Sequence, residues 1–484
     1  MDNGKLGNKL YDGDIQDLFL DASNKLFNAV SHTIGPNGKN TAIPTQNNYL
    51  SIINDGKTIL ENISSNDEAT KLALNTLKES CFATNLKASD GTTSTVVLQH
   101  MLLKNILEYN KLNSDKIDSK LLVSIRDILL DRLSMFKKDI SSDEDLEKVI
   151  TVALGSNEYT DIVMKAFGGI PKNQKPTLVK VREQIETTCI NIDGINLSPV
   201  EINPVVLKTI SLASDEPLNV IVLDQEISRI DTAFAKLLEK ISKSDKKTIM
   251  LYTDIKPSVM DQLLYNIQQG ALNLVPVRLA MSTTNRDELI SDLADFFRLV
   301  VIDELNPYQT HYMDSNIFGE GTGYIMDKDS IIVKNDNEEY DEKVRYLPAH
   351  STAIQVGFIT YSQQDEEYRR LEDAIGSAYN ALNYGYVVGG GYTYYCLAQY
   401  LSDEFKIDNK DIINPIKEAL GYIFNYLSED SKMQFIDYIM ENAFDSYKVA
   451  EQVILNSFTV VSQILSTECL LVPYIRNNVK GVIE

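Results

Sequence analysis

The segment SDGTTS, residues 89–94, stands directly before a long apolar run, VVLQHMLLKNIL. Small hydroxyl residues at the start of a helix leave backbone N–H groups free at the positive end of the helix dipole, which favours phosphate. Asp90 would repel phosphates by itself, but Mg²⁺ takes oxygen ligands from a carboxylate and from a triphosphate together. The segment therefore indicates a site for Mg²⁺ and a nucleoside triphosphate. The alternative is that Asp90 only caps the helix.

Two glycine turns and two further carboxylates are weaker signals. TIGPNG, residues 33–38, follows a helical pattern, and GGG, residues 389–391, follows two valines. Either turn could let a ligand approach the main chain closely. Neither has the spacing of a Walker A motif or of a dinucleotide-binding fingerprint. Taken singly, these turns, the Asp55–Gly56 pair and Asp373 on a charged helix all have ordinary structural interpretations.

The elements that carry these segments change in character along the chain. Apolar residues at helical spacing predict helices over 14–33, 66–87, 92–110 and 117–136, and again between 392 and 484. Between 194 and 345 apolar strands alternate with helices, which predicts a mostly parallel sheet. The order helical, mixed, α/β, mixed, helical indicates nested domain insertions. We expect boundaries that give the segments 1–136, 137–193, 194–351, 352–383 and 384–484.

Composition and charge exclude several classes of protein. The chain has 484 residues, with 46 Lys and Arg against 69 Asp and Glu, so its net charge of −23 should repel nucleic acid. No window approaches roughly 18 uninterrupted apolar residues and no leader is visible, so we expect a soluble, cytoplasmic protein without a membrane partner. The cysteines form no CxxC pair and the histidines no HExxH motif, which argues against a zinc site.

Taken together, five motifs in one order resemble the group I chaperonin (GroEL) family: TIGPNGKN, NDG at 54–56, SDGTTST, LEDAIGSAYNALNYGYVVGGG and STECLLV. Members of that family show TLGPKGRN, KDG, GDGTTT, EDALHATRAA leading to VVAGGG, and TEC. The resemblance covers nearly the whole chain. It implies an α+β multidomain protein with the chaperonin fold: a mainly helical equatorial ATPase domain, a small mixed intermediate domain and an inserted α/β apical domain.

The resemblance also implies roles for single residues in binding and hydrolysing ATP. Asp90 would bind the Mg²⁺ that bridges the phosphates, Asp373 would position the attacking water, and Asp55 would assist near the γ-phosphate. Asp445 and the glycine triplet would lie against the ribose. The full set of other residues expected at the nucleotide is Thr33, Ile34, Gly35, Pro36, Asn54, Gly91, Thr92, Thr93, Ser94, Gly389, Gly390 and Asp445.

Two departures from the family pattern bear on function. The family's lysine before the Asp–Gly pair is Asn54 here, so charge compensation would rest more heavily on Mg²⁺ and a bound K⁺, and hydrolysis would be slow. The alternative is that the family's lysine acts through its backbone, in which case Asn54 serves as well. The base-contacting segment is also shortened. Such divergence indicates a viral or otherwise specialised relative.

By resemblance, the inserted domain would bind unfolded client proteins and a cochaperonin through two helices, expected over 227–241 and 257–269. The apolar stripe of the first helix fits a buried face, whereas that of the second spans an arc too wide for one sheet face to cover, so part of it should stay exposed. The matching positions are Phe234, Leu237, Met260, Leu264 and Tyr265. The subunits would assemble into a homo-oligomeric ring, of seven by resemblance.

Two other interpretations stay open. A ring-forming binding or scaffold protein with weak or lost ATPase activity would fit Asn54 and the shortened base segment. An unrelated α/β nucleotide enzyme would need a small-molecule pocket within 194–345, where no clustered acid, base or nucleophile is visible.

Overall fold

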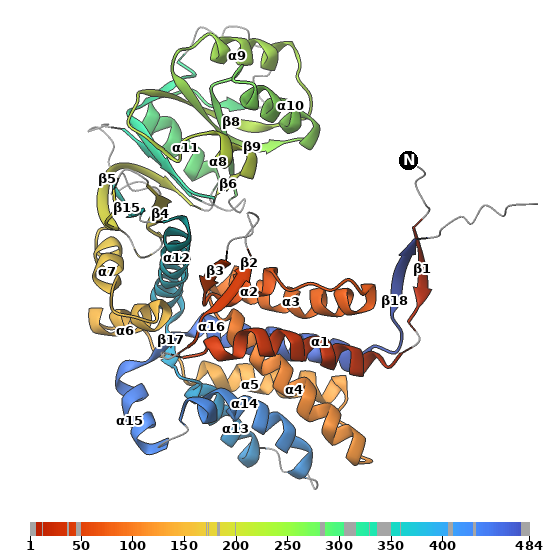
Figure 1. The fold of residues 1–484 in the computed structure, drawn as a ribbon. Helices are drawn as coiled ribbons and strands as arrows, with labels where there is room; N and C mark the ends of the chain where they lie inside the picture. The colour runs from red at the N-terminus through yellow and green to blue at the C-terminus, as the bar shows by residue number, and fades with distance from the viewer. Residues whose placement is uncertain are drawn as a thin grey trace, which may run out of the picture. The chain divides into compact units, whose positions relative to one another are not determined.

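The computed structural model describes residues 6–11, 13–35, 38–44, 50–170, 172, 174–181, 184–198, 200–280, 286–303, 316–328, 330–335, 350–358, 360–404, 410–428 and 432–475. The chain divides into two compact units, one formed by residues 1–160 with 369–484 and the other by residues 161–368 (Figure 1). The first unit therefore contains segments from both ends of the chain. In the described part of the chain, no helix is both long and apolar enough to cross a membrane.

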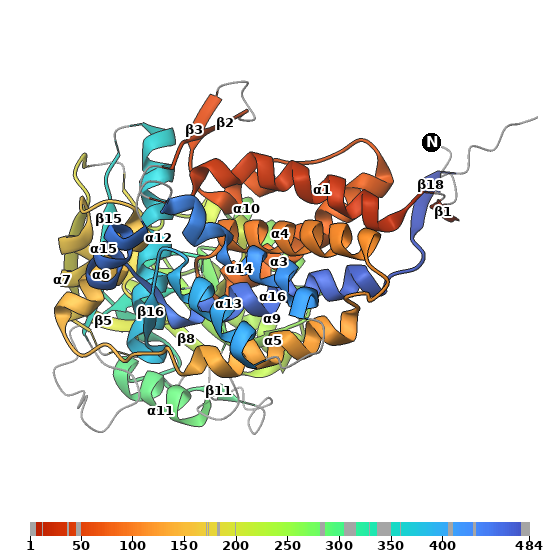
Figure 2. The same cartoon turned by 90° about the horizontal axis from the view of Figure 1, so that it is seen from below.

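Long helices build the first unit, because their apolar residues recur at helical spacing and pack on one another. They are α1 (Ile15–Val30), α3 (Glu68–Ala88), α4 (Thr92–Leu112), α5 (Ser119–Ser134), α13 (Tyr392–Glu404), α14 (Asn414–Leu427) and α16 (Tyr447–Ser466). α16 packs on α3, α4 and α5, and α14 packs on α4, so both ends of the chain share one core (Figure 2). The four helices predicted before residue 137 are confirmed to within a few residues.

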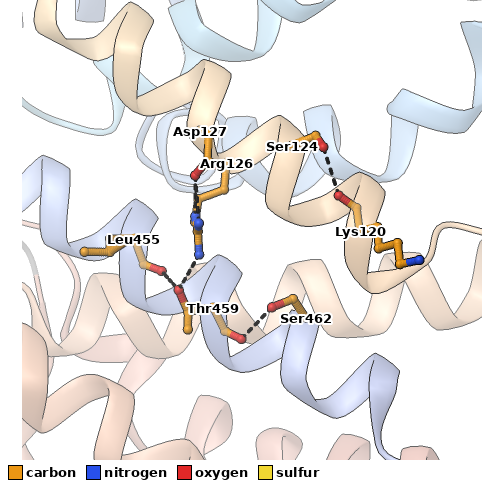
Figure 3. A network of polar contacts seen from close by, with 7 residues as sticks. All are labelled: Lys120, Ser124, Arg126, Asp127, Leu455, Thr459 and Ser462. Atoms are coloured by element: carbon orange, nitrogen blue, oxygen red, sulfur yellow. Dashed lines mark hydrogen bonds and ion pairs between the residues drawn. The ribbon is translucent and has the colours of Figure 1, made fainter.

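Polar side chains cross the interface between α5 and α16 (Figure 3). The Arg126 guanidinium donates to the Thr459 hydroxyl at 3.1 Å and to the neighbouring Asp127 carboxylate at 2.7 Å. The Ser462 hydroxyl donates to the backbone carbonyl of Thr459 at 2.8 Å. These groups have partners within the protein, as is usual for polar groups that folding removes from water.

Shorter elements complete the first unit. They are α2 (Gly56–Glu61), α6 (Asp143–Leu154) and α15 (Lys432–Asn442), with the antiparallel strand pairs β1 (Leu6–Leu10) and β18 (Leu471–Ile475), β2 (Thr41–Pro44) and β3 (Leu50–Ile53), and β16 (Tyr386–Val388) and β17 (Phe444–Ser446). The helix α12 (Tyr361–Tyr384) begins in the second unit and ends in the first. Its second half carries Asp373.

The second unit contains a mostly parallel sheet, as the alternation of strands and helices predicts. The parallel strands are β8 (Leu218–Ile227), β9 (Lys247–Ile255), β10 (Leu274–Leu279) and β11 (Ile302–Asp303), and β6 (Val200–Ile202) and β12 (Gly319–Gly321) pair antiparallel with β10 and β8. The helices of this unit include α8 (Pro204–Thr209), α9 (Thr232–Ser242), α10 (Pro257–Gln268) and α11 (Arg286–Phe297). Alternate residues of β8 and β9 belong to two different apolar clusters, so both faces of the sheet are buried.

A second sheet in this unit joins segments that lie far apart in the sequence. Its strands are β4 (Thr177–Lys180), β15 (His350–Val356), β5 (Thr188–Leu197), β14 (Ile331–Lys334), β13 (Gly323–Met326) and β7 (Ala213–Ser214), in that order. β15 pairs parallel with β4 and antiparallel with β5. The helix α7 (Thr160–Gly168) comes before β4 in the chain.

The helix expected over 227–241 starts later than predicted. β8 continues to Ile227, and the chain enters α9 only at Thr232. Asp231 sets this start, because its carboxylate accepts a hydrogen bond from the backbone N–H of Phe234 at 2.9 Å. The apolar residue Ile227 thus belongs to the end of a strand rather than to the helical stripe.

Candidate active site

Asp55 caps the short helix α2 and lies at the junction of α2 with α4. Its carboxylate accepts hydrogen bonds from the backbone N–H groups of Lys57 and Thr58 at 3.1 and 3.0 Å. A Cβ atom at Gly56 would lie 2.3 Å from Thr93 Oγ1. Only glycine therefore lets the start of α2 approach the start of α4 so closely.

The loop between α3 and α4 presents Asp90 beside an uncapped helix start. Ser89 ends α3 with a φ of 63°, and Gly91 enters α4 with a φ of +92°. Gly91 is the N-cap residue of α4, and no side chain accepts a hydrogen bond from the first turn. The alternative in which Asp90 only caps the helix is therefore wrong. The first turn of this long helix keeps N–H groups that an anion can bind.

Two close contacts hold α12 against this loop. A Cβ atom at Gly376 would lie 2.0 Å from the Cβ of Ser89, so α12 touches the loop directly at Gly376. Asn380 donates from its side chain to the backbone carbonyl of Ala88 at 2.9 Å. Asp373, three residues before Gly376, lies on the same face of the helix.

The carboxylates of Asp373, Asp90 and Asp55 interact by charge. The pKa of Asp373 is raised well above its usual range, first by burial and then by the negative charges of Asp90 and Asp55, while the positive charge of Lys57 opposes the rise. The pKa of Asp90 is also raised, mainly by burial, with a contribution from Asp55. Taken singly, Asp373 had an ordinary structural interpretation; in the structure it is partly buried and interacts by charge with Asp90 and Asp55.

Asp445 joins the cluster from the strand β17. β16 pairs with β17 so that Val387 stands opposite Asp445, and the backbone N–H of Gly389 donates to the carbonyl of Ala443 at 2.8 Å. A Cβ atom at Gly389 would lie 2.8 Å from a carboxylate oxygen of Asp445. Burial first, and the charge of Asp90 second, raise the pKa of Asp445 to about 7.

Asp90 and Asp445 face a shared small cavity. The residues that line it are Asp90, Val149, Val152, Ala153, Ser377, Phe444, Asp445, Ser446 and Val449. The hydroxyl oxygens of Ser377 and Ser446 are buried and have no hydrogen-bond partner in the protein. The cavity measures about 10 Å³, which is room for one water molecule among these polar groups.

A metal ion at Asp90 would need further oxygen ligands. In the described part of the chain, no group of three or more His, Cys, Asp or Glu side chains could hold a metal ion by itself. Mg²⁺ is usually bound through one or two carboxylates together with phosphates and water. The residues at the site therefore fit a Mg²⁺ ion that arrives with a nucleotide.

The other residues predicted at the nucleotide lie in several places. The Thr33 hydroxyl donates to the carbonyl of Val30 at 2.8 Å, and Gly35 has a φ of +82° and packs against Leu427 of α14. Ile34 follows Thr33 in extended conformation, and Pro36 lies outside the described residues. Thr92 is buried, Thr93 and Ser94 are partly buried, and the side chain of Asn54 is exposed; Gly390 faces Phe435 and Ile439 of α15.

Sequence reasoning missed Lys57, Ser377 and Ser446. The first lies two residues after Asp55 and interacts with Asp373 by charge. Ser377 lies four residues after Asp373, a spacing that places both on one helix face, so its position could have been predicted. Ser446 directly follows Asp445, but nothing in the sequence indicates that its hydroxyl lacks a partner.

Four of the five positions predicted to bind clients are wholly or partly buried, so the exposed surface expected on α10 is much smaller than predicted. Phe234 and Leu237 on α9 and Leu264 on α10 are buried, with exposed fractions of 6%, 4% and 9%, and Met260 is partly buried. Tyr265 is 63% exposed. The wide apolar arc of α10 is covered from two sides: Leu264 packs in one apolar cluster with Val206 of α8, and Leu263 packs in the other.

Comparison with known proteins places the chain in a family. The TCP-1/cpn60 chaperonin family matches residues 26–317. A chloroplastic chaperonin GroEL from Gracilaria tenuistipitata var. liui is 23% identical and covers 97% of this chain and 99% of its own length. Chaperonin GroEL 1 from Corynebacterium glutamicum (strain R) is 22% identical and covers 96% of each.

A solved structure has the same fold. The chaperonin gp146 from the bacteriophage EL 2 (Pseudomonas aeruginosa), crystallised in the presence of ATP-BeFx, superimposes with a TM-score of 0.69 over 96% of this chain and 98% of its own, at 15% identity. The predicted α+β chaperonin fold is thereby confirmed. With a family match over more than half of its length and relatives that extend over nearly all of it, the chain belongs to the TCP-1/cpn60 chaperonin family.

Proposed function

We propose that this chaperonin subunit hydrolyses Mg·ATP at the site formed by Asp55, Asp90 and Asp373, and that hydrolysis drives the capture and folding of non-native proteins in a ring. The observation that carries the proposal is the convergence of these carboxylates at the uncapped start of α4. A single acidic residue beside a helix N-terminus would be ordinary. Three carboxylates that interact by charge there form a polar site suited to a cation and phosphates.

Asp90 is the residue that would hold Mg²⁺. Its pKa is raised mainly by burial, and the hydrogen bond from the backbone N–H of Gly91 offsets this only in part, so a cation would stabilise the ionised form further. The metal would supply charge neutralisation for the carboxylate and the phosphates. The free N–H groups of the first turn of α4, with the hydroxyls of Thr93 and Ser94, would bind the phosphate oxygens.

Asp373 would position the attacking water and accept its proton. A carboxylate with a raised pKa is a stronger base than an exposed one, provided that it is still ionised at the working pH. Lys57 favours the ionised form by opposing the rise in pKa. Both carboxylate oxygens of Asp55 accept backbone hydrogen bonds from α2, so Asp55 acts on the site by its fixed charge.

The proposal also includes the domain boundaries, the ring and the partners of the subunit. We assign 1–136 and 384–484 to an equatorial domain, 137–193 and 352–383 to an intermediate domain, and 194–351 to an apical domain. Asp373 then lies on the intermediate domain and Asp90 on the equatorial one. A bound K⁺, a ring of seven and a cochaperonin follow the family pattern, and Tyr265 is the exposed position of α10 that a client would contact.

The test separates binding from turnover. In the purified full chain, Asp373→Ala should lower the steady-state release of phosphate from Mg·ATP by about 100-fold or more, with the nucleotide Kd nearly unchanged, because the carboxylate acts in the transition state. Asp90→Ala should instead weaken Mg·ATP binding. Equal losses of binding and turnover in Asp373→Ala would contradict the assignment.

The same assay decides between the proposal and a scaffold protein. The wild-type chain should release phosphate at a measurable rate when Mg²⁺ and K⁺ are both present. Tight nucleotide binding without turnover would favour a ring-forming protein that has lost hydrolysis. Electron microscopy with and without ATP would report the ring and its number of subunits.

A further inference from the structure

We propose that Thr84 is a positioning residue for ATP hydrolysis, because its hydroxyl fixes the Asp90 loop between α3 and α4 against the helix α16. The inference rests on the proposed function, in which Asp90 holds Mg²⁺. Thr84 lies on α3 and is fully buried. It therefore acts through the loop rather than by touching a nucleotide.

The Thr84 hydroxyl joins three helices of the first unit. It accepts a hydrogen bond from the side-chain amide of Asn456 on α16 at 2.9 Å, and another from the hydroxyl of Thr95 on α4 at 3.1 Å. It donates to the backbone carbonyl of Ser80 on its own helix at 3.1 Å. A hydroxyl has one hydrogen and two lone pairs, so all of its hydrogen-bonding positions are used. A buried polar network that is fully satisfied favours one arrangement of the helices over others.

The same network reaches the backbone of the Asp90 loop. The Thr95 hydroxyl also donates to the carbonyl of Gly91, at 2.9 Å. A Cβ atom at Gly91 would lie 3.2 Å from the methyl group of Thr84 and 2.9 Å from Val449 of α16. The backbone of the loop thus rests directly on Thr84 and on α16.

The loop depends on such support because its backbone conformation is unusual. Ser89 and Gly91, on either side of Asp90, have φ values of 63° and +92°. A residue with a side chain is strained in the left-handed region and keeps that conformation only where the surrounding structure fixes it. The backbone N–H of Gly91 also donates to the Asp90 carboxylate, so a shift of Gly91 would move the residue that holds the metal.

The test compares Thr84→Val, which keeps the shape of the side chain and removes the hydroxyl, with Thr84→Ser, which keeps the hydroxyl. In Thr84→Val, the Mg²⁺ concentration for half-maximal release of phosphate from ATP should rise about five- to tenfold, and so should the Kd for Mg·ADP measured by isothermal titration calorimetry. Thr84→Ser should give wild-type values for both. Each variant is assayed well below its melting temperature, so that a loss of folded protein does not contribute. A Thr84→Ser variant that behaves like Thr84→Val would contradict the role of the hydroxyl.

A double-mutant cycle determines whether Thr84 acts through Asp90. In an Asp90→Asn background, adding Thr84→Val should change the Kd for Mg·ADP by less than about twofold, because both side chains contribute to the same interaction with the metal. An equal effect of Thr84→Val with and without the Asp90 carboxylate would overturn the inference. So would a Thr84→Val single variant with the wild-type dependence on Mg²⁺.

The matched control is Ser462→Ala, which removes another buried hydroxyl of α16 that donates to a backbone carbonyl, that of Thr459 (Figure 3). It should melt at a lower temperature than the wild type and keep the wild-type dependence on Mg²⁺. If it instead shifted that dependence as much as Thr84→Val does, general loss of stability would explain both, and the inference would be wrong. An Asp90→Asn variant that binds Mg·ADP like the wild type would overturn the proposed role of Asp90 itself, and the inference with it, which is a different outcome.

Discussion

Replacing Asp445 by asparagine should stabilise the nucleotide-free protein at alkaline pH and have little effect near pH 4. Folding raises the pKa of this carboxyl from 3.8 to about 7, first through burial and then through the charge of Asp90. An acid whose pKa rises on folding binds its proton more tightly in the folded state. The contribution of Asp445 to stability is therefore fully present below about pH 4 and is lost as the pH rises to about 7.

The size of the effect follows from the shift. A change from 3.8 to about 7 is roughly three units, and at about 1.4 kcal/mol per unit the ionised Asp445 lowers the free energy of unfolding by up to about 4 kcal/mol above pH 7. Asparagine has nearly the same shape and no charge to bury. Asp445→Asn should thus gain up to this amount near pH 8 and almost nothing near pH 4.

Urea denaturation of the nucleotide-free chain at the two pH values measures the difference. The stability of the variant relative to the wild type should rise between the two pH values by the amount that Asp445 contributes. A gain that is equal at both pH values would refute the reasoning, because it would come from packing rather than from charge. A variant that is less stable than the wild type near pH 8 would show that the ionised carboxylate is compensated within the protein.

Four further substitutions test other parts of the structure. Lys57→Met removes the positive charge that lowers the pKa of Asp373, so the acid limb of the pH–rate profile for ATP hydrolysis should move to higher pH; an unmoved limb would contradict this. Tyr265→Ser should reduce capture of a denatured client with little change in melting temperature, whereas Leu264→Ser should destabilise the second unit by about 3 kcal/mol; equal behaviour of the two would contradict the burial difference. Gly91→Ala should cost at least about 1–2 kcal/mol, measured by urea denaturation, because the position has a φ of +92°.

The helical and α/β parts of the fold could be predicted because burial leaves a periodic pattern. The helices α1, α3, α4 and α5 each bury one face in a shared core, and the apolar residues of β8, β9 and β10 are separated by helices of ordinary length. The start of α9 was predicted too early because the strand residue Ile227 has the same apolar character as a helical one. The capping Asp231 was the signal that would have placed it correctly.

Exposure was harder to predict than helix position. The apolar arc of α10 is too wide for one sheet face, and from this a surface groove was expected. The structure covers the arc with two apolar clusters, one of which includes Val206 of α8, so Leu264 is buried and only the flanking Tyr265 stands out. A helical pattern gives the width of an apolar face but not the number of elements that pack on it.

The charges at the candidate site were also hard to predict from the sequence motif alone. Asn54 removes the lysine that the family pattern places before the Asp–Gly pair, and from this a weaker, slower site was expected. Lys57, three residues later, interacts by charge with Asp373, while the side chain of Asn54 is exposed. A positive charge is therefore retained beside the acidic cluster, on the first turn of α2 rather than before it. The motif shows that the lysine before Asp55 is lost. It does not show that Lys57, on the first turn of α2, supplies a positive charge that interacts with Asp373.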